Sequence, residues 1–251
     1  MTHVHHTEVD RSELPTHLKI GLVTRFFYAA SCAIAFLLLF VLIGKIAAHY
    51  ADLKWYSLLA IPLGMILADF LSGVIHWSAD TWGSESMPIL GKRLLHPFRV
   101  HHVNPADFLR RQFIDTNGDV AFLAIPFLLA ALKIPLTSPT MLSMALFITS
   151  FAAVGLMTNQ IHQWAHMRSA LWPISWLQRF GIILSHEAHQ QHHQPPYAQN
   201  YCIATGWCNR PLMAINFFTR MERLITRITG VHPRVDEVQF SASLTQDMRQ
   251  P

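Results

Sequence analysis

Four stretches of this chain are long and apolar enough to cross a lipid bilayer as helices, and they constrain the fold more than any other feature. A spanning helix needs about 20 mostly apolar residues, and the stretches at 26–47, 57–77, 119–136 and 140–161 come near that length. Of the 251 residues, 51% are hydrophobic and 14% are charged, and the mean hydropathy is +0.27. The sequence therefore predicts an all-α integral membrane protein with four transmembrane helices.

Short connections pair these stretches into hairpins. Residues 48–56 join the first two, and the segment IPLTSPT, whose prolines favour a turn, joins the last two. The chain has no internal repeat and no polar linker between domains. We expect one membrane domain over residues 26–230, with an N-terminal tail at 1–25 and a C-terminal tail at 231–251.

The lysines and arginines predict the orientation of the chain. Sixteen of the 19 lie in the N-terminal tail, the central loop and the C-terminal third, against Lys45, Lys54 and Lys133 in the other two loops. Because cytoplasmic loops carry an excess of basic residues, we expect both termini and the central loop to be cytoplasmic. The net charge of +4 is then a topology signal and does not indicate a nucleic-acid partner. The apolar segments at 170–185 and 211–229 are expected to lie in the membrane interface.

Histidine is the second unusual feature, with 16 in the chain. Imidazole is the commonest protein ligand of metals, and four histidine clusters fall on the predicted cytoplasmic side. They lie at the inner ends of the second and fourth stretches, in the central loop and in the C-terminal third. The predicted ligand set is His76, Asp80, His101, His102, His162, His166, His189, His192 and His193. The expected fold is thus four transmembrane helices with a cytoplasmic, histidine-rich metal-binding cap.

Helical spacing indicates how this set serves two ions. Residues four apart share a helix face, as His162 and His166 do. In the HxxHH segment, His192 and His193 both lie one turn from His189 but diverge from each other by about 100°. Nine ligands exceed the need of one ion, and two ions with about four or five each retain room for oxygen or water. The pattern favours a dinuclear redox site, although imidazole alone does not select the metal.

Four other polar residues carry further predictions. Asp69 and Asn159 lie within the second and fourth stretches, before the histidines of those stretches. They are predicted either to support a ligand histidine through hydrogen bonds or to pair with polar groups inside the bundle. Asn117 and Asp119 are expected to cap the third helix.

The remaining histidines are kept outside the ligand set. His96 and His186 adjoin the clusters, and His49 is on the opposite side of the membrane. The others are expected to be solvated in the tails, namely His3, His5, His6, His17 and His232.

The motif segments resemble those of the Kua-type lipid desaturases. They are DFLSGVIHWSADTWGS at 69–84, PFRVHHVNP at 97–105, FIDTNGD at 113–119, NQIHQWAH at 159–166 and HQQHHQPPYAQNYCIATGWCNRPL at 189–212. Their order and spacing make the resemblance specific, and it runs from about residue 69 to 225. It implies a non-haem di-iron centre of two iron ions held by the eight clustered histidines, with Asp80 as a further carboxylate.

The resemblance also implies O2-dependent desaturation of a chain in a membrane phospholipid. The plasmanylethanolamine type of this family makes the vinyl-ether double bond of plasmalogens, and this is the expected activity because ligands at the interface favour carbons near the headgroup. An external electron donor, cytochrome b5-like or ferredoxin-like, would supply two electrons. The alternative is a double bond near the carbonyl of a phospholipid acyl chain, as in the phosphatidylglycerol type.

Two other classes stay open on the residues alone. A membrane zinc hydrolase also uses histidines and carboxylates, but HEAH around Glu187 is not the HExxH motif and the histidines exceed its needs. The other class is a non-enzymatic metal-binding or signalling membrane protein. The three cysteines lack paired spacing and predict neither disulfides nor a thiolate zinc site.

Overall fold

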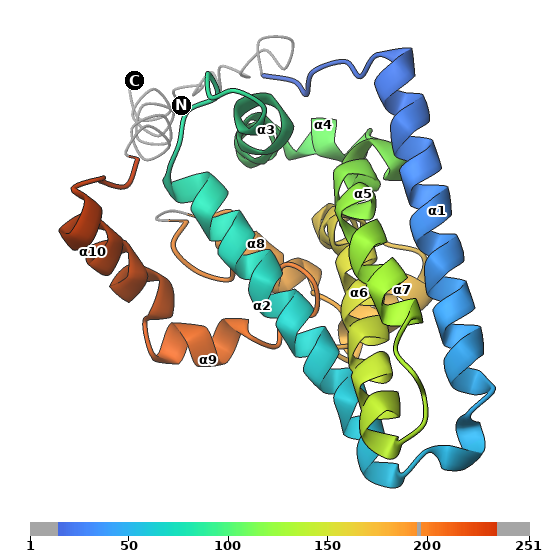
Figure 1. The fold of residues 1–251 in the computed structure, drawn as a ribbon. Coiled ribbons are helices and arrows are strands. Elements are labelled where there is room, and N and C mark those ends of the chain that lie inside the picture. Colours follow the sequence, from blue (N-terminus) through green and yellow to red (C-terminus); the bar gives the residue numbers. More distant parts are fainter. Residues whose placement is uncertain (1–14, 195–196, 235–251) are drawn as a thin grey trace, which may run out of the picture.

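The computed structural model describes residues 15–194 and 197–234, and within them the chain forms helices and no strand (Figure 1). Most of the two predicted tails, including His3, His5 and His6, lies outside the described residues. The four predicted spans are confirmed as helices long and apolar enough to cross a membrane. They are α1 (Leu22–Ala47), α2 (Ala60–Thr81), which continues the 3-10 turn Trp55–Leu59, α5 (Phe113–Leu132) and α6 (Pro139–His166). The chain is therefore a multi-pass membrane protein.

The long helices form a bundle in which consecutive helices run in opposite directions, so α1 is parallel to α5 and α2 to α6 (Figure 1). α1 packs along α5, α2 packs along α6, and α5 contacts α6. Side chains on the inner faces form a core that buries several leucines completely or nearly so, because helices in a bundle pack their facing side chains closely. These leucines are Leu39, Leu42, Leu128, Leu142 and Leu156.

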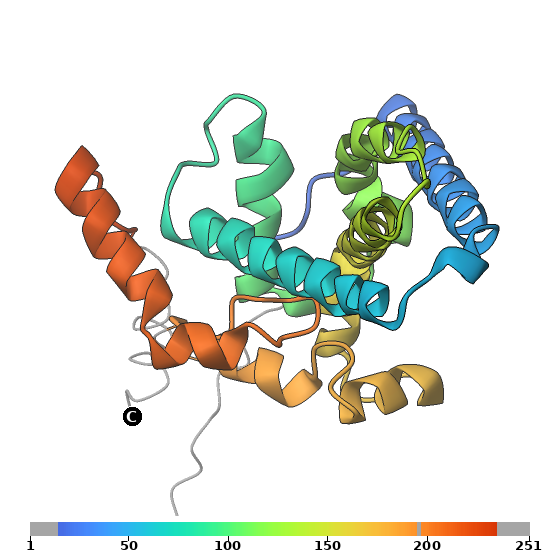
Figure 2. The same cartoon turned by 60° about the horizontal axis from the view of Figure 1, so that its bottom comes forward.

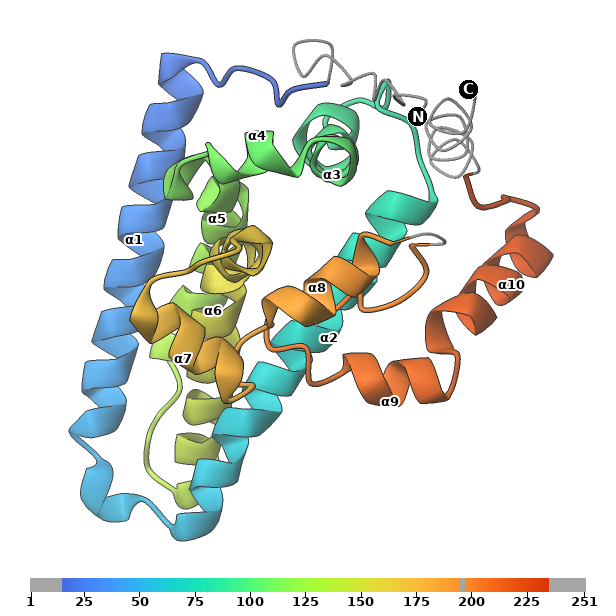
Figure 3. The same ribbon diagram turned by 180° about the vertical axis from the view of Figure 1, so that it is seen from behind.

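One end of the bundle carries only connections. The 48–59 and 133–138 segments lie there (Figure 1), and the ammonium group of Lys45 donates to the carbonyl oxygens of Leu132 and Ile134 at 2.8 and 2.6 Å. These bonds satisfy carbonyl groups that the end of α5 leaves without helical partners. The short helices between α2 and α5 lie at the opposite end, and the first three short helices after α6 lie alongside the bundle (Figure 3).

The third long helix begins six residues before the predicted start of its span at residue 119. Gln112 is the N-cap and makes no side-chain cap bond, so the expectation that Asn117 and Asp119 cap this helix is wrong. Asn117 lies inside the helix and donates to the carbonyl of Phe113 at 3.0 Å. Asp119 accepts from the Tyr28 hydroxyl on α1 at 2.8 Å. Asn117 therefore bonds within its own helix and Asp119 bonds across to α1, and neither lies at the helix end.

The short helices follow α2 and α6. A π-helical turn at Gly91–Leu95, α3 (His96–Val103) and α4 (Pro105–Leu109) connect α2 to α5. Helices α7 (Trp172–Arg179), α8 (His186–His192), α9 (Asn209–Ala214) and α10 (Phe217–Thr229) come after α6. Figures 2 and 3 show α7, α8 and α9 crossing α2 and α6, with α10 beyond them. The 211–229 segment is broken at Asn216, whose φ of 50° is left-handed. Its interfacial placement stays a prediction.

Gly64 lies where α2 comes closest to α6. A Cβ atom at this position would be 2.4 Å from the carbonyl oxygen of Phe147 and 2.9 Å from the amide nitrogen of Phe151. Both neighbours are backbone atoms and cannot rotate away. The two helices therefore approach each other through the absence of a side chain.

We predict that Gly64→Ala lowers the free energy of unfolding by about 1–3 kcal/mol, because overpacking a close contact forces the backbones apart. Thermal unfolding of the purified protein in detergent measures this. The matched control is Gly155→Ala on α6, where nothing lies within 4 Å of the added Cβ, and which is expected to be neutral or slightly stabilising because Ala is the better helix former. Equal melting curves for the two variants would contradict the contact.

Candidate metal centre

All nine side chains of the predicted ligand set meet in two adjacent groups. Within each group, one ligand atom per residue lies within 4.8 Å of all the others. The five-histidine group comprises His101, His162, His166, His189 and His193. The aspartate group comprises His76, Asp80, His102 and His192. The ligand atoms come from α2, α3 and α6, and from α8 with the residue after it.

Helix geometry divides neighbouring histidines between the groups. His101 and His102 are adjacent on α3 and enter different groups, because consecutive helical side chains diverge by about 100°. His189 and His193 are four residues apart and share the five-histidine group, whereas His192 belongs to the aspartate group. The spacing of the HxxHH segment thus has the geometric consequence expected from the sequence.

Three imidazole nitrogens converge on a fourth in the five-histidine group. The Nε2 atoms of His162, His166 and His193 lie 2.9, 2.8 and 3.1 Å from Nε2 of His189. A ring nitrogen is either a donor of one hydrogen or an acceptor with one lone pair, so these contacts are not all hydrogen bonds. Nitrogens bound to one metal ion at about 2.0–2.1 Å and at right angles are about 3 Å apart. The group therefore fits the coordination sphere of a metal ion.

The carboxylate of Asp80 occupies the middle of the aspartate group. Its Oδ2 is 3.3 Å from Nε2 of His76, 3.3 Å from Nε2 of His102 and 3.6 Å from Nε2 of His192. Within the described residues, neither carboxylate oxygen has a hydrogen-bond partner, and the buried Nε2 of His101 in the other group has none either. Buried polar atoms of this kind are costly unless something binds them, and a metal cation in each group would do so.

Backbone carbonyls orient two rings of the aspartate group. Nδ1 of His76 donates to the carbonyl of Tyr201 at 3.2 Å, and Nδ1 of His192 donates to that of Gln199 at 2.8 Å. A proton on Nδ1 leaves the lone pair on Nε2, which faces Asp80. The ring orientation and tautomer are therefore those that a metal ligand needs.

Burial lowers the pKa of four histidines of the two groups that lie outside the spans, which favours their neutral form. Burial lowers the pKa of His192 to about 4, and the neighbouring His102 lowers it further while Asp80 opposes the shift. Burial likewise lowers the pKa of His101, His189 and His193. Neutral imidazole is the form that binds metal.

Asp69 and Asn159 make contacts away from the imidazoles. Asp69 is completely buried, and its carboxylate accepts the backbone N–H groups of Thr205, Gly206 and Cys208 at 2.8, 2.8 and 2.9 Å. Asn159 on α6 donates to the carbonyl of Thr116 on α5 at 2.6 Å. These contacts correspond to the second of the two predicted roles, pairing with polar groups inside the bundle.

His17 contradicts the expectation that it is solvated in the tail. Its side chain is 6% exposed, and its backbone N–H and Nδ1 contact Oδ2 of Asp107 at 2.8 and 2.6 Å. The imidazole stacks on Phe108, whose ring also packs against His162. Residues 15–21 fold over α4 because Asp107 and Phe108 supply partners 90 residues away. No local pattern in the sequence signals this contact.

Three other histidines also lie apart from the two groups. Nδ1 of His96 contacts Oε2 of Glu85 at 2.7 Å, and Nδ1 of His186 donates to the carbonyl of Ala165 at 2.7 Å. His232 is exposed, as expected. His96 and His186 therefore stabilise the surroundings of the site through partners of their own.

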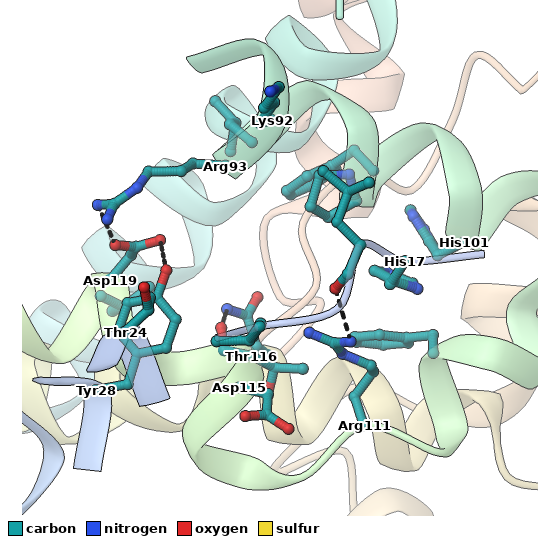
Figure 4. A pocket seen from close by; sticks show the side chains of 18 of the residues that line it. His17, Thr24, Tyr28, Lys92, Arg93, His101, Arg111, Asp115, Thr116 and Asp119 are labelled. Atoms are coloured by element: carbon teal, nitrogen blue, oxygen red, sulfur yellow. Dashed lines mark hydrogen bonds and ion pairs between the residues drawn. The ribbon is translucent and has the colours of Figure 1, made fainter. Parts of the chain in front are cut away.

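A cavity of about 360 Å³ borders the five-histidine group (Figure 4). His101 and His162 form part of its wall, and the rest comes from residues 17–28, 92–98, 108–120 and Asn159. The sequence interpretation missed this wall, because it treated residues 1–25 as a tail and the basic residues only as topology signals. The cavity provides a place for a substrate beside the ligand nitrogens.

The helical membrane fold and the two ligand groups define a membrane protein with a metal centre. Residues 65–236 match the family model of the lipid desaturase domain. Plasmanylethanolamine desaturase of Myxococcus xanthus is 42% identical over 189 residues, which are 75% of this chain and 67% of that protein. Plasmanylethanolamine desaturase 1 of Mus musculus is 40% identical over 194 residues, 74% of this chain and 71% of that protein. Chloroplastic fatty acid desaturase 4 of Arabidopsis thaliana is 35% identical over 214 residues, which are 84% of this chain and 64% of that protein.

This chain belongs to the lipid desaturase family, which confirms the resemblance that its motifs indicate. It is a membrane oxidoreductase that desaturates lipids, and the hydrolase and signalling alternatives are set aside. No solved structure is significantly similar to it.

Proposed function

We propose that this protein is a di-iron desaturase of ether phospholipids, which introduces the vinyl-ether double bond. The observation that carries the proposal is the pair of adjacent ligand groups beside a cavity. Two relatives at 42% and 40% identity are named plasmanylethanolamine desaturases. The relatives named fatty acid desaturases are 35% identical or less, so an acyl chain near its carbonyl is the second candidate substrate.

The proposed centre holds two iron ions, one in each group. The five-histidine group offers five nitrogen ligands, and the aspartate group offers three nitrogens and a carboxylate. Nitrogen and oxygen ligands of this kind suit iron. The ring centres of His101 and His102, from different groups, are 4.5 Å apart, and those of His76 and His162 are 5.5 Å apart. This closeness supports one dinuclear site over two separate ones.

The balance of the reaction fixes its partners. Removing one hydrogen from each of two neighbouring carbons forms the double bond and yields two electrons and two protons. Reducing O2 to two waters takes four electrons and four protons, of which the substrate supplies two of each. The other two electrons come from an external donor, cytochrome b5-like or ferredoxin-like, and the other two protons come from water. Bound iron supplies the oxidising chemistry with O2, and the protein supplies binding, orientation and exclusion of water.

Aromatic side chains of the cavity wall perform part of that task. The ring of Phe108 lies 5.0 Å from that of His162, and the ring of Phe98 lies 5.0 Å from that of His76. Both phenylalanines line the cavity. They place apolar surface next to the ligand imidazoles, which favours an alkyl chain there and disfavours water.

We predict that active protein carries about two irons per chain, because the nine ligands suffice for two ions. His193→Ala removes a ligand of the five-histidine group and His192→Ala one of the aspartate group, so each is expected to contain fewer irons and to form no product. His49 lies at the other end of the bundle, where its Nδ1 contacts the Lys45 carbonyl. His49→Ala is therefore the matched control and is expected to retain both the iron content and the product formation. Elemental analysis that found one zinc and no iron in active protein would rule out the di-iron assignment.

The orientation follows from the sixteen-to-three distribution of basic residues, which we propose places both termini and the metal centre in the cytoplasm. Reporter tags at both termini are expected to be cytoplasmic, and a tag within 50–55 is expected on the other side. A lumenal or periplasmic C-terminus would overturn the proposed orientation. If the N-terminus were on that side as well, the count of four spans would still hold. If the N-terminus were cytoplasmic, the count would be wrong too.

The product distinguishes the two candidate substrates. Cells that express the protein and receive a 1-O-alkyl phospholipid are expected to gain lipids that release aldehydes in acid, because a vinyl ether is acid-labile. Cells that express His193→Ala provide the control. Lipid mass spectrometry that found no acid-labile product and a new double bond near an acyl carbonyl would reject the ether substrate and support the acyl one.

A further inference from the structure

Four basic residues line the cavity, and Figure 4 shows Lys92 and Arg93 on one side of it and Arg111 on the other. They come from the N-terminal segment, the π-helical turn and the connection after α4, namely Lys19, Lys92, Arg93 and Arg111. The acidic residues of the lining are Asp115 and Asp119.

Both acids already have basic partners. Asp119 accepts from Nη1 of Arg93 at 2.8 Å and from the Tyr28 hydroxyl at 2.8 Å. Asp115 pairs with Nε of Arg25 at 3.4 Å. The other cations of the lining have no ion pair within the described residues, and these are Lys19, Lys92 and Arg111. Within the part of the chain that the structure describes, the cavity therefore carries three positive charges that no ion pair neutralises.

Arg111 has the geometry of an anion-binding residue. One of its terminal nitrogens, Nη1, donates to the carbonyl of Leu18 at 3.3 Å, which holds the guanidinium in place. Its own carbonyl accepts from Nε2 of Gln163 at 2.9 Å. The Nε–H is buried and has no hydrogen-bond partner within the described residues. A buried N–H without a partner costs free energy, and the planar guanidinium matches the oxygens of a phosphate.

We propose that Arg111 forms a subsite for the phosphate of the phospholipid substrate, and that Lys92 and Lys19, on other parts of the cavity wall, add positive charge that attracts it. The same cavity is lined by His101 and His162, so a lipid held by its phosphate has the first carbons of its chains beside the ligand groups. The volume of about 360 Å³ is in the range of small-molecule sites. The subsite thus selects phospholipids over uncharged glycerolipids. This inference rests on the proposed function for the identity of the lipid.

The test measures binding separately from turnover. The full-length protein in an uncharged detergent is titrated calorimetrically with a short-chain 1-O-alkyl phosphatidylethanolamine, and with the 1-O-alkyl-2-acylglycerol of the same chains, which lacks the phosphate. We expect the phospholipid to bind at least tenfold more tightly. Arg111→Gln is expected to weaken phospholipid binding about tenfold and to leave binding of the uncharged lipid unchanged, because it removes one charge-assisted contact.

Matched variants keep the result interpretable. Arg110→Gln is the control, because Arg110 is the exposed neighbour of Arg111 and does not line the cavity, and it is expected to bind like the wild type. Lys92→Gln replaces an exposed side chain, and it is expected to weaken phospholipid binding severalfold without affecting folding. Arg111→Lys is expected to restore part of the affinity.

Three results would overturn the phosphate subsite. They are equal binding of the two lipids by the wild type, unchanged phospholipid binding in Arg111→Gln and Lys92→Gln, or an equal loss for both lipids in these variants. Inorganic phosphate is the further arm: if it binds in the absence of lipid as tightly as the phospholipid does, the site is for a free anion and the lipid assignment fails. Product formation with no phosphate discrimination sinks this inference alone, whereas phosphate discrimination with no desaturation sinks the proposed function alone.

Discussion

The structure depends on nine side chains whose potential metal-ligand atoms are too close together to satisfy one another. The Nε2 atoms of His162, His166 and His193 all face that of His189 within 3.1 Å, and neutral imidazoles offer only one donor and one acceptor each. The Asp80 carboxylate faces three further imidazoles. These atoms are buried, and a bound cation would satisfy them. Helices α2, α3, α6 and α8 converge here and bring these side chains together.

A stripe along α2 connects this centre to the segment after the last histidine cluster. Asp69 binds the backbone at 205–208, Ser72 accepts the N–H of Ile203 at 3.1 Å, and His76 donates to the Tyr201 carbonyl at 3.2 Å. Gly73 lies between them, where a Cβ would be 2.4 Å from Sγ of Cys202. Residues spaced three and four apart share one helix face, so α2 binds this segment over two turns. Asp69 therefore supports the centre by positioning backbone, even though its hydrogen bonds reach no imidazole.

The sequence predicted what depends on composition and local spacing. The apolar stretches gave the four spans, and the spacings in HQWAH and HxxHH indicated which histidines share a helix face. Contacts between distant segments were beyond such reasoning. His17 is buried because Asp107 binds it, and Asp119 lies inside α5, where it accepts from Tyr28, a residue 91 positions away. The cavity is missing from the sequence interpretation for the same reason, since its wall combines four separate segments.

The two ligand groups differ in their access to that cavity, and this difference bears on which carbons react. His101 and His162 of the five-histidine group line the cavity, whereas His76 and His192 of the aspartate group do not and are 0% exposed. A chain entering the cavity therefore meets the five-histidine group first. If its phosphate is held by the basic wall, only carbons a few bonds from the glycerol reach those imidazoles, and the far end of the chain cannot. Position within the cavity would then fix the site of the double bond by distance from the headgroup, without any need for the protein to measure the length of the chain.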